Sequence, residues 1–423
     1  MKWMKGIKSR WLWGVVLAAG LCLPQGAAAQ WRLVDGEEVS LELSANLQML
    51  SAYVVLPQFE LPPPLEGLFP EDAGLGSAVG RLEWSARFGE RVSVEMHNRL
   101  FWQASTITGE ELQQGFGVTR GVDRRLDSET VFLESETTRL VHDFDRLLVG
   151  IYFERADVYL GRQAISWGVS SLFPVADRFA PLSPFELDTL QRRGLDAARV
   201  VAHVTPEVEV DLVVADRGPD EPLAMAGRVE YFGAAMDVYA GVGRFWERLS
   251  ALGGVSWLAG NWKVYGEGEA LWNLEEGALD PPRVTVGAQR VSMSWQIGAE
   301  LHYNGFGTTE SQDYAAVLAS PEFQRGESYF LGRYYGGVNG FYAFETGWGL
   351  GGGVMANLMD PSVVIFPSVQ YEVGQQMTVS AGAFLGFGEG GQVVFEGLVP
   401  ALVLESEYGS FADMYFVQMA AFF

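Results

Sequence analysis

The chain ends on DMYFVQMAAFF, residues 413–423, and this stretch shows which kind of sheet to expect. Every second residue from Tyr415 to Phe423 is apolar, and the last one is aromatic. Successive side chains of a β-strand point to opposite faces, so this spacing predicts a strand with one apolar face. The ends of soluble domains are more often polar and frayed. The C-terminus therefore predicts a strand whose apolar face needs an apolar environment.

The N-terminus has the order of features that a secretory signal peptide requires. Basic residues occur only in its first ten positions, and the 13 residues Trp11–Leu23 carry no charge. This run is shorter than the ~20 apolar residues of a membrane-spanning helix. Ala27–Ala29 supplies small residues, so we expect residues 1–29 to be cleaved off after Ala29. The only cysteine, Cys22, lies in this segment, so the mature chain is expected to have no disulfide.

The composition suits a membrane barrel better than a soluble domain. Hydrophobic residues make up 48% of the chain and aromatic residues 13%, and there are 51 glycines. Abundant aromatic residues with weak, alternating hydrophobicity are typical of transmembrane β-barrels. The 53 acidic and 29 basic residues give a formal net charge of -24, which disfavours nucleic acid as a partner. Acidic side chains that lined a cavity would attract cations.

Alternation of apolar and polar residues is the dominant pattern between the two ends. It is clear in RVSVEMHNRLFWQ (91–103), VEVDLVV (208–214) and WKVYGEGEALWN (262–273). Each stretch predicts a strand with one apolar and one polar face. In a transmembrane barrel the apolar face meets lipid and the polar face meets the lumen. The polar positions expected to face a lumen are Glu95, His97, Arg99, Glu209, Asp211, Lys263, Glu267 and Glu269.

Turn signals divide the chain into about eighteen strands, with sixteen or fourteen as open alternatives. The apolar phase slips near Glu154 and Arg155, where a bulge or a further turn is expected. Tight connections are expected near Gly89, Asp143–Arg146, Pro206, Phe232–Ala234, Gly260, Val291–Ser294, Glu345–Gly347 and Gly374. Longer ones are expected over 54–76, 104–127, 164–195, 217–222, 274–282, 305–326 and 388–411.

The pattern of connections decides between two all-β folds. A soluble antiparallel sandwich has the same strand period. Short periplasmic turns opposite longer external loops are instead typical of outer-membrane barrels. The predicted fold is therefore a single transmembrane antiparallel β-barrel over 39–423, behind a periplasmic lead-in of residues 30–38. We expect the proline-rich stretch 56–70 in the first external loop and a short helix within 305–326.

The longest expected loop, 164–195, is the candidate constriction of the lumen. A barrel of ~16–18 strands encloses an aqueous channel, and a loop folded inward would narrow it. Opposed acids and arginines there would favour small polar or charged solutes, unless these charges pair with each other on the outer surface. The constriction candidates are Asp177, Arg178, Glu186, Asp188, Arg192 and Arg193, with Arg162 and Gln163 expected to tie the loop to the barrel.

The stretch GRQAISWG (161–168) only partly matches a nucleophile elbow. That motif needs Gly-x-Ser-x-Gly between a strand and a helix, and Ala164 stands in place of the first glycine. Prolines after Gly168 favour an extended loop over a helix, so Ser166 is not expected to be catalytic. We expect no enzyme activity, cofactor or metal site, because none of the histidines lies in a motif with a serine. These are His97, His142, His203 and His302.

Longer motifs carry a family resemblance. VYLGRQAISWGVSSLFPVADRFAPLSPFELD (158–188), ELHYNGFG (300–307) and NLMDPSVVIFPSVQY (357–371) resemble a motif block of porin-like outer-membrane β-barrel proteins of Gram-negative bacteria. The resemblance covers most of 155–423. It implies a barrel in the outer membrane, in contact with its lipid, and carries over no substrate. The terminal strand, with Tyr415 and Phe423, resembles the signal that the β-barrel assembly machinery recognises.

The expected function is an outer-membrane channel for passive or facilitated diffusion of small polar or charged solutes, with a preference for cations. A transporter for hydrophobic molecules is the alternative, and an enzyme or an anchor fits less well. Strands begin near Val39, which leaves no room for the plug of an energised receptor. The solute and the oligomeric state stay open. Aromatic residues around the long loop would suit the hydrophobic alternative: Trp167, Leu172, Phe173, Phe179 and Phe185.

Overall fold

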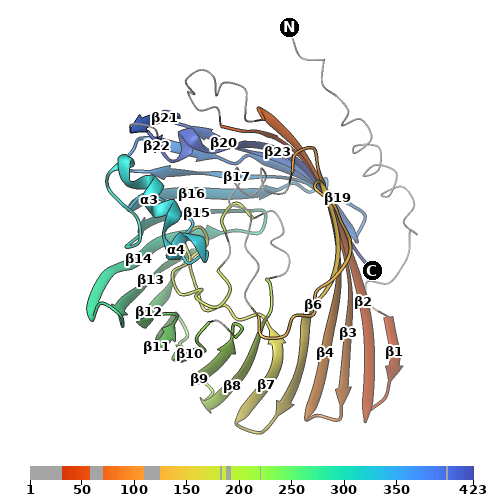
Figure 1. The fold of residues 1–423 in the computed structure, drawn as a ribbon. Helices are drawn as coiled ribbons and strands as arrows, with labels where there is room; N and C mark the ends of the chain where they lie inside the picture. The colour runs from red at the N-terminus through yellow and green to blue at the C-terminus, as the bar shows by residue number, and fades with distance from the viewer. Residues whose placement is uncertain are drawn as a thin grey trace.

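The computed structural model describes a wall of antiparallel strands that closes on itself (Figure 1). The first and last strands of the wall pair with each other, from Asn46 opposite Phe422 to Val55 opposite Asp413. The expected signal peptide and Asp188 lie outside the described residues, as does most of the proline-rich stretch. The described residues are 31–57, 70–108, 124–181, 183–186, 192–219, 221–396 and 399–423.

Eighteen strand positions form the wall, which confirms the number expected from the sequence. One position is shared by β18 and β19, which both pair with β17 and β20. The strands are β2 (Val39–Val55), β3 (Asp72–Phe88), β4 (Val92–Ser105), β6 (Thr138–Tyr152), β7 (Ala156–Gln163), β8 (Leu195–Thr205), β9 (Val208–Asp216), β10 (Ala224–Phe232), β11 (Met236–Phe245), β12 (Arg248–Ala259), β13 (Trp262–Asn273), β14 (Ala278–Val291), β15 (Trp295–Tyr303), β16 (Tyr334–Ala343), β17 (Trp348–Asn357), β18 (Ser362–Ile365), β19 (Ser368–Val373), β20 (Met377–Phe387) and β23 (Asp413–Phe422).

Other elements lie at the ends of the wall. In the lead-in, β1 (Trp31–Asp35) pairs with the first residues of β2, and β5 (Thr130–Glu134) pairs with the first part of β6. The loop after β15 contains η1 (Ser311–Asp313), α3 (Tyr314–Ala319) and α4 (Pro321–Gln324), as expected from the sequence. The loop after β20 contains the hairpin of β21 (Gly391–Glu396) and β22 (Val399–Leu404), and then η2 (Tyr408–Ser410).

One expected turn is wrong. Asp143–Arg146 lies inside β6, which pairs with β4 on both sides of this point. The register shifts there, between the partners of His97 and Asn98, so the charged run forms a bulge. The chain instead turns after Tyr152, where the slip of the apolar phase had indicated a bulge or a turn. A cluster of charged residues is typical of turns, which explains the error.

The remaining expected tight turns are found, and they all lie at one end of the barrel. Two short connections at the other end were not expected: one at Trp246 and Glu247, the other over 358–361. We refer to the two ends as the short-turn end and the long-loop end. Trp246 has a φ of 51°, unusual for a residue other than glycine.

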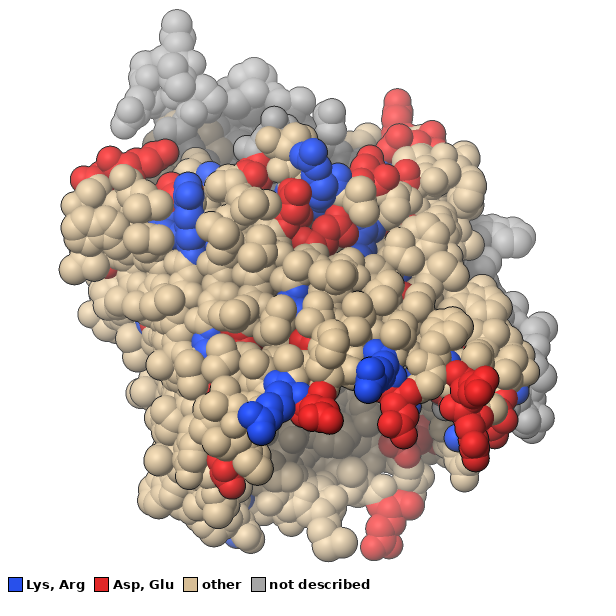
Figure 2. All heavy atoms as spheres, turned by 90° about the horizontal axis from the view of Figure 1, so that it is seen from below, with Lys and Arg blue, Asp and Glu red and all other residues tan. Residues whose placement is uncertain are grey.

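The outward face of the wall is apolar. Side chains such as Val242, Trp257 and Leu301 are more than half exposed. Figure 2 shows one face on which charged residues gather along two edges, with a mostly uncharged band between them. Inward side chains on the same strands are polar and often buried, because segments of the chain fill part of the interior. Within the part of the chain that the structure describes, no helix is long and apolar enough to cross a membrane.

Candidate functional site

The segment after β7 leaves the wall at Gln163 and enters the barrel interior, where it runs across the lumen (Figure 1). We call its described residues between 164 and 186 the inward segment. Its backbone N–H groups at Val169 and Val175 donate to the carboxylate of Glu267, at 2.8 and 2.5 Å. Glu267 is on the inward face of β13 and is 3% exposed. The segment is thus fastened to the inner wall by its backbone.

A second carboxylate, on β15, holds the tip of the inward segment. Glu300 accepts hydrogen bonds from the backbone N–H groups of three consecutive residues, Ser171 at 2.6 Å and Leu172 and Phe173 at 3.0 Å. Such N–H groups would otherwise be buried without partners, because the segment forms no strand or helix there. An ionised carboxylate is a strong acceptor for several donors at once. Glu300 therefore fixes both the position and the turn of the tip.

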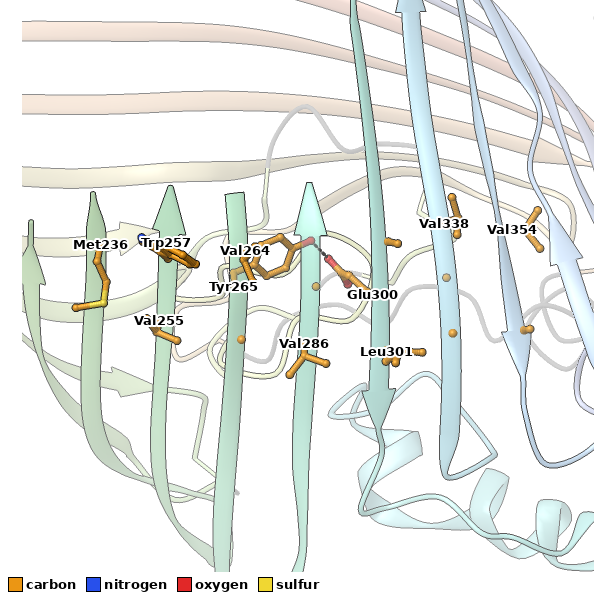
Figure 3. Close-up of a pocket in the computed structure, with 16 residues that line it drawn as sticks. Met236, Val255, Trp257, Val264, Tyr265, Val286, Glu300, Leu301, Val338 and Val354 are labelled. Atoms are coloured by element: carbon orange, nitrogen blue, oxygen red, sulfur yellow. Dashed lines mark hydrogen bonds between the residues drawn. The ribbon is translucent and has the colours of Figure 1, made fainter. Parts of the chain in front are cut away.

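Each of the two carboxylates also accepts a hydrogen bond from a tyrosine, whose ring passes over a glycine on the strand between them. Tyr265 on β13 reaches over β14 to donate to Glu300 at 2.5 Å, as Figure 3 shows. A side chain at Gly287, on the strand between, would place its Cβ 2.7 Å from the Tyr265 ring. Tyr239 on β11 likewise crosses Gly254 on β12 and donates to Glu267 at 3.1 Å. Glycine leaves the space that each ring needs. The tyrosine, glycine and glutamate occur on successive strands in both cases.

Asp177 closes the base of the inward segment. Its Oδ1 accepts from the Ser166 hydroxyl at 2.7 Å and from the backbone N–H groups of Trp167 and Gly168, at 2.8 and 2.9 Å. Its Oδ2 accepts from Arg192 at 2.6 Å. Ser166 thus donates to a carboxylate that also accepts from an arginine, and so helps to close the base of the segment.

Arg178 joins the inward segment to the wall and to the loop after β15. Its guanidinium lies 3.2 Å from Glu269 on β13 and 2.7 Å from Glu327, and all three side chains are at most 1% exposed. Arg283 on β14 donates to the other oxygen of Glu269. Burial alone would lower the pKa of Arg178, but the charges of Glu269 and Glu327 outweigh it and raise the pKa. The arginine is therefore held charged.

Arg162 lies within the wall, next to a gap in strand pairing. β6 pairs on this edge with β7 at one end and with β5 at the other, and Asp143–Arg146 between them pairs with neither. The Arg162 guanidinium fills the gap: it donates to the Phe144 carbonyl at 2.9 Å and to Asp196 on β8 at 2.9 Å. Gln163 donates to carbonyl oxygens of β7 and β8. Both side chains are at most 5% exposed and anchor the start of the inward segment.

Aromatic side chains pack the inward segment against the wall. Trp167 and Phe179, each 2% exposed, belong to a cluster with inward residues of β8 to β12. Leu172 and Phe173 pack in a second cluster with Tyr335 on β16 and with residues of β17, β18 and β20. The aromatic residues that would suit transport of hydrophobic molecules are thus mostly buried, while Phe185 is only partly buried.

The remaining predicted residues are distributed over the inner wall. Asp211 on β9 accepts from the indole N–H of Trp167 at 2.8 Å and is paired with Arg199. The carboxylate of Glu209 on β9 lies 2.9 Å from Nδ1 of His203. Lys263 lies over the Tyr265 ring. Glu186 and Arg193 are both half-buried.

A different set of charged side chains faces inward from β3, β4 and β6. Arg81 lies 2.9 Å from Asp145, and Arg99 lies 4.0 Å from the same carboxylate. The bulge in β6 brings Asp145 and the following Arg146 to this face, and Arg146 donates to the carbonyl of Arg192 at 2.6 Å. We call these residues, with the neighbouring Glu95 and His97 of β4, the β3–β6 sector. The inward residues of β11, β13, β14 and β15 that hold the inward segment form the β11–β15 sector.

Several residues of the site were missed from the sequence. Glu300, Tyr265 and Tyr239 occupy inward positions of alternating strands, so their facing was open to prediction from the strand period. Nothing in the sequence tells which inward carboxylate binds the inward segment. Asp145 was missed because a turn was expected where β6 has its bulge.

The site has no metal-binding cluster within the described residues, counting groups of three or more His, Cys, Asp or Glu side chains. At the tip of the inward segment, His302 stacks on Phe173 at 5.2 Å between ring centroids. Its Nδ1 lies 2.9 Å from the hydroxyl of Thr285, which itself donates to the Phe173 carbonyl. His302 therefore packs the tip of the inward segment.

Comparison with known proteins gives structural neighbours only. No family model and no curated protein sequence matches the chain. Among solved structures it is similar to OccK8 (OprE) of Pseudomonas aeruginosa, with a TM-score of 0.52 and 10% identity over 90% of this chain and 97% of that one. OpdK of Pseudomonas aeruginosa gives 0.51 and 10%, and OccAB4 of Acinetobacter baumannii gives 0.50 and 8%, each over 90% of this chain and 98% of the other.

These neighbours are porins of Gram-negative bacteria, as the sequence resemblance had indicated. Identity this low establishes the fold and nothing finer. The fold of the chain is thus a closed, antiparallel, porin-like barrel of eighteen strands.

Proposed function

We propose that the protein is an outer-membrane channel through which small polar or charged solutes diffuse, with the inward segment as its constriction. The observation that carries the proposal is the fastening of this segment, inside a barrel of eighteen strands, to the carboxylates of Glu267 and Glu300. A barrel of this size is wide enough for an aqueous passage, and a fixed segment inside it sets the size of solute that passes.

The outward apolar band and the barrel fold support a place in the outer membrane. Backbone groups in lipid need internal partners, which a closed barrel supplies. The signal peptide expected over residues 1–29 and the aromatic terminal strand support export and recognition by the β-barrel assembly machinery. In the structure Tyr415 is 46% exposed on the outward face, and the backbone of Phe423 pairs with Ala45 on β2.

A preference for cations is part of the proposal, supported by the net charge of -24. Glu267 and Glu269 are 3% and 2% exposed and bonded, so they lend this preference less support than expected. The preference depends on more open carboxylates such as Glu95 and Glu209. The test is the reversal potential of the purified, folded protein in a planar bilayer across a KCl gradient. A potential of the sign for anions would refute the preference without affecting the channel.

Single-channel recording tests the channel itself. We expect stepwise conductance from the folded wild type, and a larger step from a variant that lacks residues 170–190. Both proteins must first show the heat-dependent gel shift of a folded barrel. A folded wild type without conductance steps would refute an open channel, and an unchanged step in a folded deletion variant would refute the constriction.

The identity of the solute needs a survey. The solved structure of OpdK carries vanillate, a small aromatic carboxylate. We therefore include vanillate with sugars, amino acids and simple cations in liposome-swelling assays. Co-purified lipid or hydrocarbon in the lumen would instead favour transport of hydrophobic molecules, for which the partly buried Phe185 is the remaining support.

A further inference from the structure

The outward face of the wall is hollowed over β11 to β17. The hollow has a volume of about 980 Å³. Figure 3 shows some of the apolar side chains that line it, among them Val264, Val286 and Leu301 on neighbouring strands. Glycine and alanine positions such as Gly336 and Ala299 deepen it, because they place no larger side chain on this face. An apolar hollow on a membrane face has room for a chain that is not part of the protein.

An arginine lies on the same face, near the short-turn end. Arg290 on β14 pairs in register with Trp262 and Ile297, whose side chains are 43% and 44% exposed on the outward face. Its guanidinium carbon lies 5.7 Å from the centre of the Trp262 ring and 5.4 Å from that of Trp295. Among the described residues, no carboxylate forms an ion pair with Arg290. The turn over Ser292–Ser294 follows directly.

The arginine and the hollow are placed to bind the headgroup and an acyl chain of one lipid molecule. Tryptophan rings favour the border between apolar chains and headgroups, so they mark the depth of Arg290 in the membrane. An unpaired guanidinium at that depth attracts a phosphate. Arg290 is four residues from Val286, which is ~13 Å along a strand, so a headgroup at the arginine leaves its acyl chain over the hollow.

We propose that this face binds an anionic phospholipid of the leaflet at the short-turn end, with its phosphate at Arg290 and an acyl chain in the hollow. The proposal rests on the membrane location in the proposed function, and is independent of whether the lumen conducts. Charge complementarity selects this occupant. The chain as a whole is acidic, with a net charge of -24, yet this face presents a positively charged guanidinium, which attracts an anionic headgroup.

Native mass spectrometry of the full-length, detergent-solubilised protein tests the proposal. Phosphatidylglycerol is added in equal amount to phosphatidylcholine of the same acyl chains. We expect the wild type to retain phosphatidylglycerol, and Arg290→Gln to retain about five-fold less, which corresponds to about 1 kcal/mol for one arginine near a membrane surface. Ala299→Trp, which fills the hollow, should lower the retention of both lipids.

Arg244→Gln is the matched control. Arg244 is an exposed arginine at the long-loop end of β11, with outward register partners Met225 and Leu249. It should leave retention unchanged, and all variants must show the gel shift of a folded barrel. Equal retention by wild type and Arg290→Gln would overturn the proposal. So would an oligomer of the chain that dissociates on Ala299→Trp while lipid retention stays constant, because a second copy would then fill the hollow.

Conductance is recorded for the same samples. If the wild type does not conduct, but retains more phosphatidylglycerol than Arg290→Gln does, the channel is refuted and the lipid site is supported. A protein that conducts while its lipid retention ignores Arg290 would do the opposite. The two proposals therefore fail separately.

Discussion

The two charged sectors of the inner wall use their charges in different ways. In the β11–β15 sector, Glu267 accepts two backbone N–H bonds from the inward segment and Glu300 accepts three. In the β3–β6 sector, Arg81 and Arg99 lie beside Asp145 of the wall itself. The first sector holds a structural element, whereas the carboxylate of the second, Asp145, is paired with arginines of the wall. An inward carboxylate in a barrel is thus a charge for the solute only where no segment of the chain has taken it.

The largest effect should follow from removal of the Glu300 carboxylate. Glu300→Ala leaves the N–H groups of Ser171, Leu172 and Phe173 without their acceptor. Each unsatisfied buried donor costs about 1–3 kcal/mol, so the tip should leave the wall rather than stay in place. We expect a larger and noisier single-channel conductance. Planar-bilayer recording measures it, after a gel shift has shown that the barrel is folded.

Glu372→Ala is the control for this change. Glu372 is an exposed glutamate on β19, next to a short turn, and its loss should not produce the larger and noisier conductance of Glu300→Ala. If Glu300→Ala folds and conducts like this control, the β11–β15 sector does not hold the constriction, and the contrast between the two sectors fails.

A buried carboxylate is used in the same way at the long-loop end. Glu407, just before η2, accepts from the backbone N–H of Leu331 at 3.1 Å and from Asn357 at 2.8 Å, and it is hydrogen-bonded to Tyr335. It thereby joins the loop after β20 to the loop after β15. Burial raises its pKa to about 7, and the nearby charge of Asp360 adds to this.

This pKa predicts how stability depends on pH. The folded protein favours the neutral carboxyl, because its pKa is above the ordinary value of 4.5. The stabilisation from Glu407 is therefore complete below about pH 4.5 and is lost as the pH rises through 7, by roughly 3 kcal/mol in all. The measurement is the denaturant midpoint between pH 4 and 8, and Glu407→Gln should flatten this part of the profile. If the wild type and Glu407→Gln show the same dependence of the midpoint on pH, Glu407 does not stabilise the contact between the two loops.

The β3–β6 sector predicts a change in selectivity with the segment left in place. Arg99→Gln removes a positive charge from the inward face, where the side chain is 18% exposed. A unit charge at ~4 Å in water is worth about 1 kcal/mol, so the ratio of cation to anion permeability should rise up to about five-fold. The reversal potential in a KCl gradient measures it. Arg244→Gln removes the same charge from the outward face and should leave the ratio unchanged; equal effects would mean that Arg99 does not face the passage.

The fold was largely open to prediction from the sequence. Period-two alternation set the facing of strands such as β9 and β13, because local backbone geometry determines it. The number of strands agrees with the expectation, although one expected turn was wrong and two short connections were not expected. The error at Asp143–Arg146 has a physical cause: a bulge puts consecutive charged residues on one face, and so does a turn. The short connection at Trp246 lacks a turn residue, and its partners, such as Arg217 stacked on the indole, are distant in sequence.

The site was predictable in its residue types but not in its pairings. The loop of residues 164–195 was expected to carry opposed acids and arginines, with pairing among them as the alternative, and Asp177 does pair with Arg192. Arg178 instead pairs with Glu269 and Glu327, which are 91 and 149 residues away along the chain. Contacts of this kind depend on how the barrel closes, which a strand pattern does not specify. The same holds for Glu300, which accepts from Tyr265, and for Gly287, which leaves space for the Tyr265 ring.

The smallest predicted effect separates packing from hydrogen bonding at the base of the inward segment. Trp167→Phe keeps an aromatic ring in the cluster with Phe179 but removes the indole N–H that donates to Asp211 at 2.8 Å. Asp211 keeps its two bonds from Arg199, so it is not left unpaired. We therefore expect a loss of only about 1 kcal/mol in the free energy of unfolding, measured by urea titration of the folded barrel. The conductance should not change, because Glu267 and Glu300 still hold the tip. A change in conductance as large as that of Glu300→Ala would mean that the base, and not the β11–β15 sector, sets the position of the segment.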